Sequence, residues 1–105
     1  MCGIAGFWDT RRRFDEAAGA AALRRMTRAI RHRGPDDEGH YQEREAGIAL
    51  GHRRLSIVDL SPEGHQPMVS RSGRYVIVFN GEVYNHARLR PELEAAGATF
   101  RGHSD

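Results

Sequence analysis

The chain begins Met1-Cys2-Gly3-Ile4-Ala5-Gly6-Phe7, and the second residue of this stretch is the only cysteine among 105 residues. If the initiator methionine is removed, Cys2 carries a thiol and a free α-amine on the same residue. The amine can then accept the proton of the thiol at small energetic cost near neutral pH. The stretch therefore predicts an N-terminal nucleophile, an arrangement that hydrolyses amides. A lone cysteine in an apolar strand is also commonly an ordinary reduced thiol, and its position alone favours that alternative.

The composition is that of a single globular domain. Apolar residues make up 39% and charged residues 29% of the chain, which suits a soluble domain with its own core. One cysteine cannot form an internal disulfide. No apolar run approaches the roughly 18 residues that span a bilayer, and the start lacks the basic and apolar regions of a signal peptide. We therefore expect a cytoplasmic protein without a membrane partner.

The sixteen basic residues are all arginines, and the formal net charge is +2. The triplet Arg11-Arg12-Arg13 and the helical set Arg24, Arg28 and Arg31 are candidate phosphate contacts. No aromatic residues interleave with these arginines, so a solvated charged face is the favoured interpretation. We expect no nucleic-acid partner.

Hydrophobic patterning predicts short strands that alternate with two helices. The expected strands are residues 3–8, 41–43, 48–52, 75–79 and 99–101, and the second and third of these are expected to form a hairpin around Ala46-Gly47. Strand 75–79 is β-branched and aromatic throughout, so burial on both faces is expected, and residues 33–39 are expected to form a loop. The alternation favours sheets covered by helices.

Both helices carry recognisable end signals. The first is expected at 15–32 with Asp15 as its N-cap. The second is expected at 86–96 with Asn85 as N-cap, although Pro91 favours a regular helix that starts near that residue.

Amide hydrolysis through a thiol also needs donors for the oxyanion and groups that hold the substrate. Asn80-Gly81 follows a predicted strand and offers a side-chain amide and an accessible backbone N–H. A hairpin turn is the alternative for this dipeptide, and local evidence favours it. Arg53 or Arg54 could bind a substrate carboxylate and Asp105 an ammonium, and nothing local separates the two arginines.

Metal binding is not predicted. The six histidines are scattered and none forms His-x-x-x-His or has a Cys-x-x-Cys partner. Asp36-Asp37 has the pattern of solvated acids in a loop. A Gly-x-x-x-x-Gly-Lys phosphate loop is excluded because the chain has no lysine.

Four segments together resemble the glutaminase domain of glutamine-hydrolysing asparagine synthetases, which are class II glutamine amidotransferases of the N-terminal nucleophile hydrolase fold. They are residues 1–6 (MCGIAG), 31–36 (RHRGPD), 50–59 (LGHRRLSIVD) and 79–85 (FNGEVYN). The second and third segments favour the asparagine synthetase type over related amidotransferases. Essentially the whole chain takes part in the resemblance.

The resemblance implies a chemical role for three residues. Cys2 would attack the carboxamide of glutamine to give a glutamyl thioester and ammonia. Asn80 and the backbone of Gly81 would form the oxyanion hole.

The resemblance also implies a substrate pocket. Arg54 would hold the substrate α-carboxylate, and Glu82 and Asp105 would help to bind the α-ammonium. Backbone groups near Ile57 and Val58 would line the pocket.

The implied fold is α+β, a four-layer αββα sandwich of two sheets between helical layers. Such domains are longer than this chain, so residues 1–105 are expected to be an incomplete amidotransferase domain. Family members add a C-terminal synthetase domain that uses ATP and Mg²⁺, and no cofactor is expected in this segment. Glutamine and the synthetase domain are the expected partners, with a homodimer possible. The alternatives are an amidotransferase with a different acceptor, such as a sugar or a natural-product acid, and an arginine-rich binding module without enzymatic activity.

Overall fold

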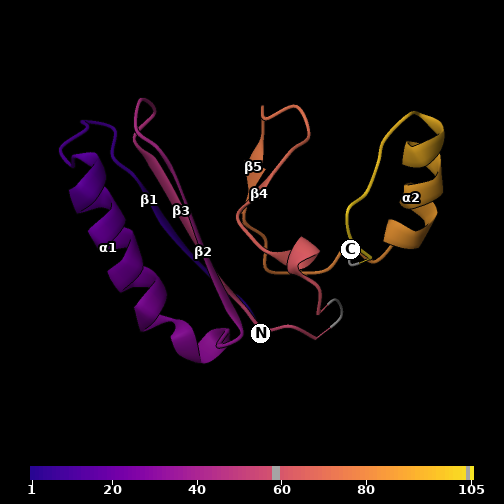
Figure 1. Cartoon of the computed structure of the whole chain (residues 1–105), viewed down its shortest axis with the longest axis horizontal. Helices are drawn as coiled ribbons and strands as arrows, with labels where there is room; N and C mark the ends of the chain where they lie inside the picture. Colours follow the sequence, from indigo (N-terminus) through magenta and orange to yellow (C-terminus); the bar gives the residue numbers. More distant parts are fainter. Residues whose placement is uncertain (58–59, 104) are drawn as a thin grey trace.

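The computed structural model describes residues 1–57, 60–103 and 105, and its architecture is α+β, as predicted (Figure 1). In chain order the elements are β1 (Gly3–Trp8), α1 (Glu16–Ala29), β2 (Asp37–Glu43), β3 (Ile48–Arg54), β4 (Met68–Val69), β5 (Val76–Ile77) and α2 (His86–Ala95). Single 3-10 turns follow α1 and precede β4, at Arg31–Arg33 and Pro62–Gly64.

The centre of the molecule is a three-stranded antiparallel sheet in the order β1-β3-β2. Gly3 pairs with Arg53 and Trp8 with Ile48, so β1 is paired along its whole length with β3. On its other edge β3 pairs with β2, from Asp37–Arg54 to Glu43–Ile48. The predicted strand 3–8 and the predicted hairpin are therefore confirmed.

Strand β2 is longer than the sequence predicts. It begins at Asp37 rather than at Tyr41, so the expectation that residues 33–39 form a loop is wrong for its last three residues. Gly39 and its acidic neighbours have low strand propensity. They are extended because β3 supplies a partner for each of them, and that tertiary pairing overrides the local preference.

Helix α1 covers one face of this sheet. Asp15 is its N-cap, as predicted, and its side chain accepts a hydrogen bond from the Ala18 N–H at 2.7 Å. Leu23 is 1% exposed, and Thr27 is fully buried. A β-carbon on Gly51 of β3 would lie 2.5 Å from Thr27 Cγ2 and 3.1 Å from Leu23 Cδ1. Only glycine at this position lets the helix approach the sheet so closely.

The second sheet contains shorter strands than the five-residue strand predicted at 75–79. Strands β4 and β5 have two residues each, with Met68 opposite Ile77. The predicted strand 75–79 is only Val76–Ile77, and Tyr75 and Ile77 are 63% and 53% exposed, so the expectation of burial on both faces is wrong. Apolar side chains favour burial, but the described residues give this ladder no covering layer.

The C-terminal expectations are partly confirmed. Helix α2 starts at His86, directly after Asn85 at the N-cap, and Pro91 lies inside it rather than at its start. Residues 99–101 form no strand. A proline within an exposed helix removes one backbone hydrogen bond, and the surrounding turns of α2 are helical despite this loss.

Figure 1 shows the order of the elements along the longest axis of the molecule: α1, the three-stranded sheet, the two-stranded sheet, then α2. The face of the large sheet opposite α1 is covered by Gln66 at Gly39 and by Gly64 at Arg54, but it is open along β1. Ile4 and Trp8 of β1 are 50% and 69% exposed there, and they alternate with residues that face the helix. Among the described residues no helix is long and apolar enough to cross a membrane.

Candidate active site

Cys2 is partly buried at the point where β1 begins. Its Sγ accepts a hydrogen bond from the Leu55 N–H at 3.3 Å and lies 3.8 Å from the Leu55 carbonyl oxygen. The Arg33 Nε–H donates to the Cys2 carbonyl oxygen at 3.1 Å. Met1 is 73% exposed and therefore accessible for removal. The thiol and the main chain of Cys2 are thus both held, while the residue in front of it faces solvent.

The strand alternation of β3 separates the two arginines that the sequence leaves open. Arg53 is 5% exposed and points toward α1. Its Nε–H donates to the Gly34 carbonyl at 2.8 Å, and its Nη1–H donates to Glu38 Oε2 at 2.6 Å. Arg53 is therefore bound to neighbouring groups within the fold, on the face that α1 covers.

Glu38 joins Arg53 to helix α1. Thr27 donates to Glu38 Oε1 at 2.6 Å, and His40 Nε2 lies 3.0 Å from the same oxygen. The hydrogen bond from Thr27 is the largest effect that lowers the pKa of Glu38, and the charges of Arg53 and His40 add to it against the opposing effect of burial. The carboxylate is therefore kept ionised between the helix and the sheet.

Arg54 lies on the opposite face of the sheet, away from α1. It is 8% exposed, and its Nη1–H donates to the Ser61 carbonyl at 2.7 Å. The guanidinium packs directly on Gly64. Because Gly3 pairs with Arg53, the next residues along the two antiparallel strands, Cys2 and Arg54, lie across from each other. The structure thus brings the predicted nucleophile and the predicted carboxylate-binding residue to the same end of the sheet.

The Asp36-Asp37 pair is not simply solvated, as the sequence suggests. Asp36 accepts the Ser56 N–H at 2.8 Å, and Asp37 Oδ2 lies 2.6 Å from His65 Nδ1. Burial would raise the pKa of Asp37, but hydrogen bonds from His65 and Glu38, with the charges of His65 and Arg54, hold it below its ordinary value. These two acids thus hold residues 56 and 65, which follow β3. The turn-like composition of residues 33–39 gave no sign of these contacts.

Asn80 and Gly81 follow β5 and are exposed. Neither is joined to Cys2 by a hydrogen bond within the part of the chain that is described. The residue before them is anchored, since the Phe79 N–H donates to Gln66 Oε1 at 2.7 Å. The ring of Phe79 lies against Gly81.

The predicted ammonium-binding residues lie near each other. The Asp105 carboxylate accepts a hydrogen bond from the N–H of Val83, the neighbour of Glu82. Glu82 is exposed. Ile57, a predicted pocket residue, is 72% exposed and comes two residues after Leu55, which contacts the Cys2 thiol. Val58 lies outside the described residues. Tertiary structure therefore gathers one group around Cys2 and Arg54 and another around Glu82 and Asp105.

His52 is a site-flanking residue that the sequence reasoning did not single out. It is 1% exposed, and its Nε2 has no hydrogen-bond partner among the described residues. Burial lowers the pKa of His52, and the nearby Phe79 backbone opposes this shift. The signal in the sequence was a histidine within an apolar strand, and its buried position became visible only in the fold.

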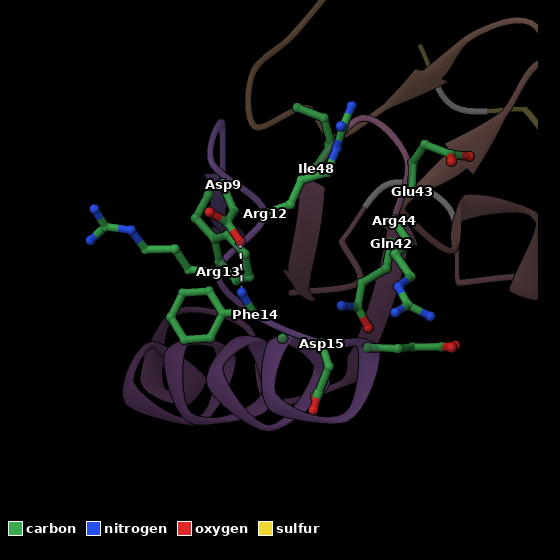
Figure 2. A pocket seen from close by; sticks show the side chains of 13 residues that line it. Asp9, Arg12, Arg13, Phe14, Asp15, Gln42, Glu43, Arg44 and Ile48 are labelled. Atoms are coloured by element: carbon green, nitrogen blue, oxygen red, sulfur yellow. Dashed lines mark hydrogen bonds between the residues drawn. The ribbon is translucent and has the colours of Figure 1, made fainter.

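A cavity of about 390 Å³ lies at the other end of the sheet. Figure 2 shows it between the start of α1 and the ends of β1 and β2, where Asp9 accepts the Phe14 N–H. None of the predicted site residues lines it. Within residues 1–57, 60–103 and 105, no group of three or more His, Cys, Asp or Glu side chains is arranged to hold a metal ion.

The glutamine amidotransferase domain family matches residues 1–105, and the chain belongs to this family. It is 41% identical over 105 residues to asparagine synthetase [glutamine-hydrolyzing] 1 of Bacillus subtilis, covering 100% of this chain and 16% of the relative. It is 38% identical over 107 residues to asparagine synthetase 3 of the same organism, covering 100% and 17%. A putative asparagine synthetase of Methanocaldococcus jannaschii is 41% identical over 109 residues, covering 89% and 20%. No solved structure matches significantly.

The chain therefore corresponds to the N-terminal glutaminase part of glutamine-hydrolysing asparagine synthetases. It spans between 16% and 20% of the length of these three relatives. The alternatives of a different acceptor and of a non-enzymatic arginine-rich module are not favoured by these similarities.

The Glu38 cluster predicts a loss of stability at acid pH. The pKa of Glu38 is lowered in the folded chain, so its contribution is complete above about pH 4.3, the ordinary glutamate value, and disappears as the pH falls through the lowered one. Glu38→Gln should lower the melting temperature at pH 7 and reduce its fall toward acid pH. Calorimetry of Glu38→Gln beside Glu92→Gln, which changes an exposed carboxylate of α2, tests this. Equal losses in the two variants would contradict the assignment.

Proposed function

We propose that this chain hydrolyses the carboxamide of glutamine to glutamate and ammonia, with Cys2 as the nucleophile. The observation that carries the proposal is the position of Cys2. Its thiol is held by Leu55 across from the buried Arg54, and an exposed Met1 precedes it. Membership of the amidotransferase family adds support.

The chemistry follows from a free N-terminus at Cys2. The α-amine takes the thiol proton, and the sulfur attacks the carboxamide carbon to form a C–S bond. The tetrahedral oxyanion collapses, the C–N bond breaks, and the amine returns its proton to the departing nitrogen as ammonia leaves. Water then hydrolyses the thioester, which releases glutamate and restores the thiol.

We infer that Arg54 binds the α-carboxylate of glutamine. A guanidinium offers parallel donors that match a carboxylate, and the buried position of Arg54 strengthens such an interaction. Glu82 and Asp105 would bind the α-ammonium, and the Val83–Asp105 hydrogen bond supports their acting together. Ile57 and Val58 are proposed to line the pocket.

Asn80 and Gly81 are proposed to donate to the oxyanion. Donors in such a site must be held in place before the charge develops. The anchoring of Phe79 by Gln66 supports this role, because Phe79 is the residue directly before the pair.

The proposed use of the ammonia lies outside this chain. Its relatives are named asparagine synthetases and are much longer, so a C-terminal synthetase domain that uses ATP and Mg²⁺ is the proposed partner. No step of the glutaminase chemistry above needs either group. The cytoplasmic location and the homodimer remain predictions.

We also propose the four-layer αββα sandwich for the complete domain. The order of α1, the two sheets and α2 along the molecule supports it (Figure 1). The exposed Ile4 and Trp8 support it too, because a face of this kind is normally covered by a second apolar layer.

Cys2 is tested by its alanine variant in the intact protein. Cys2→Ala should abolish the release of glutamate from glutamine, because both the nucleophile and its thioester are lost. Synthesis of asparagine from added ammonia and aspartate should continue, since it bypasses the thiol. Equal loss of both activities would instead assign Cys2 a structural role.

Arg54 is tested by exchanging it for lysine. Arg54→Lys should raise the Michaelis constant for glutamine, because lysine cannot form the bidentate contact. Arg53→Lys is the matched control, and it should act mainly on the melting temperature through Glu38. Steady-state kinetics and thermal unfolding separate the two effects. A larger Michaelis constant for the Arg53 variant than for the Arg54 variant would reverse the assignment.

Asn80 is tested by truncation of its side chain. Asn80→Ala should reduce the turnover number for glutamine hydrolysis by about a hundred- to a thousand-fold, the usual effect of losing one oxyanion donor. Glutamine binding should change far less, because this hydrogen bond strengthens only as the oxyanion forms. A variant with poor binding but normal turnover would refute the assignment.

A further inference from the structure

Gln66 connects the segment that carries the proposed oxyanion donors to the rest of the fold. Its Oε1 accepts the Phe79 N–H at 2.7 Å. Strand β5 ends at Ile77, so the ladder with β4 does not extend to Phe79. The Gln66 side chain holds the backbone directly in front of Asn80 instead.

Gln66 is itself fixed against the large sheet. Its carbonyl packs so closely on Gly39 of β2 that a β-carbon there would overlap it. The preceding residue, His65, lies 2.6 Å from Asp37 of the same strand. Main-chain packing of Gln66 and the neighbouring His65–Asp37 contact thus hold this segment against β2.

The contact between Gln66 and Gly39 lies beside β3, the strand that carries Arg54. Gly39 pairs with His52 of β3, which is 1% exposed and two residues before Arg54. The backbone of Phe79 lies close enough to His52 to influence its pKa in the direction of protonation. Phe79 therefore rests over the same face of the sheet as Arg54, held there by Gln66.

We propose that Gln66 is a positioning residue that sets the location of the Asn80 and Gly81 donors relative to Cys2. This inference rests on the proposed hydrolysis of glutamine. An oxyanion hole works because its donors are preorganised, and a displacement of about 1 Å can reduce the rate by about 100-fold. The Gln66–Phe79 hydrogen bond supplies that preorganisation from outside the reacting groups.

The test uses three substitutions of Gln66 and one control substitution, all in the intact protein. Gln66→Leu keeps the approximate size and removes the acceptor, and Gln66→Asn keeps the amide but shortens its reach. Both should reduce the turnover number for glutamate release by about 10- to 100-fold with little change in the Michaelis constant. Gln66→Glu retains an acceptor oxygen and should keep most of the turnover number of the unmodified protein. Gln42→Leu, at the cavity-lining end of β2, is the matched control and should leave turnover unchanged.

A double variant distinguishes positioning from general structural damage. If Gln66 acts through the two donors, Gln66→Leu or Gln66→Asn should have a smaller effect in an Asn80→Ala background than in the unmodified protein, because only the Gly81 N–H is then left to position. Ammonia-dependent synthesis should be unchanged in each single variant. If Gln66→Leu does not fold, the turnover number of Gln66→Asn tests the positioning role.

Three results would overturn the inference. Normal turnover in both Gln66→Leu and Gln66→Asn would remove the positioning role while leaving the proposed function intact, as would fully multiplicative losses in the double variant. Failure of the unmodified protein to release glutamate from glutamine would overturn both the proposed function and this inference.

Discussion

The antiparallel pairing of β1 with β3 is the constraint on which the site depends. Gly3 is paired with Arg53, and this register places Cys2 across from Arg54 and brings its thiol to the Leu55 backbone. Side chains alternate along a strand, so a slip of one residue would exchange the faces of the two arginines. Arg54 would then point at the helix and Arg53 at the site. The register is protected by Gly51, where the close approach of Leu23 and Thr27 tolerates no side chain.

The two arginines lie in different environments on opposite faces of the sheet. Arg53 is bound to Gly34 and Glu38 beneath α1, where its charge is balanced and hydrogen-bonded. A buried charge is tolerated when it is paired in this way. Arg54 is nearly as buried but sits on the other face, beside Asp37 and the Ser61 carbonyl. A guanidinium already desolvated and oriented needs little reorganisation to receive a second carboxylate.

The differences between the expected and observed elements have a common origin in tertiary pairing and covering. Residues 37–39 look like a loop because their composition is that of turns, yet β3 gives them partners and they become strand. Strand 75–79 looks doubly buried because it is apolar, yet only Val76–Ile77 is paired, and Tyr75 and Ile77 are exposed. In both cases local propensity describes what a segment could do. The neighbouring segments decide what it does.

The sequence alone determined the family, the first strand, the hairpin and the Asp15 cap, because these depend on local patterning or on a motif carried by contiguous residues, and it predicted Cys2 as the nucleophile on the same basis. Local patterning left Arg53 and Arg54 open, so that only the family resemblance favoured Arg54, and the sequence reasoning did not single out Gln66, His52 or the Asp37–His65 pair. Those roles arise from contacts between residues far apart in the chain, such as Gln66 with Phe79 and Cys2 with Leu55. Spacing along the chain does not encode such contacts. They depend on which face of a strand a side chain occupies and on how distant segments pack, and both are defined only once the sheet has formed.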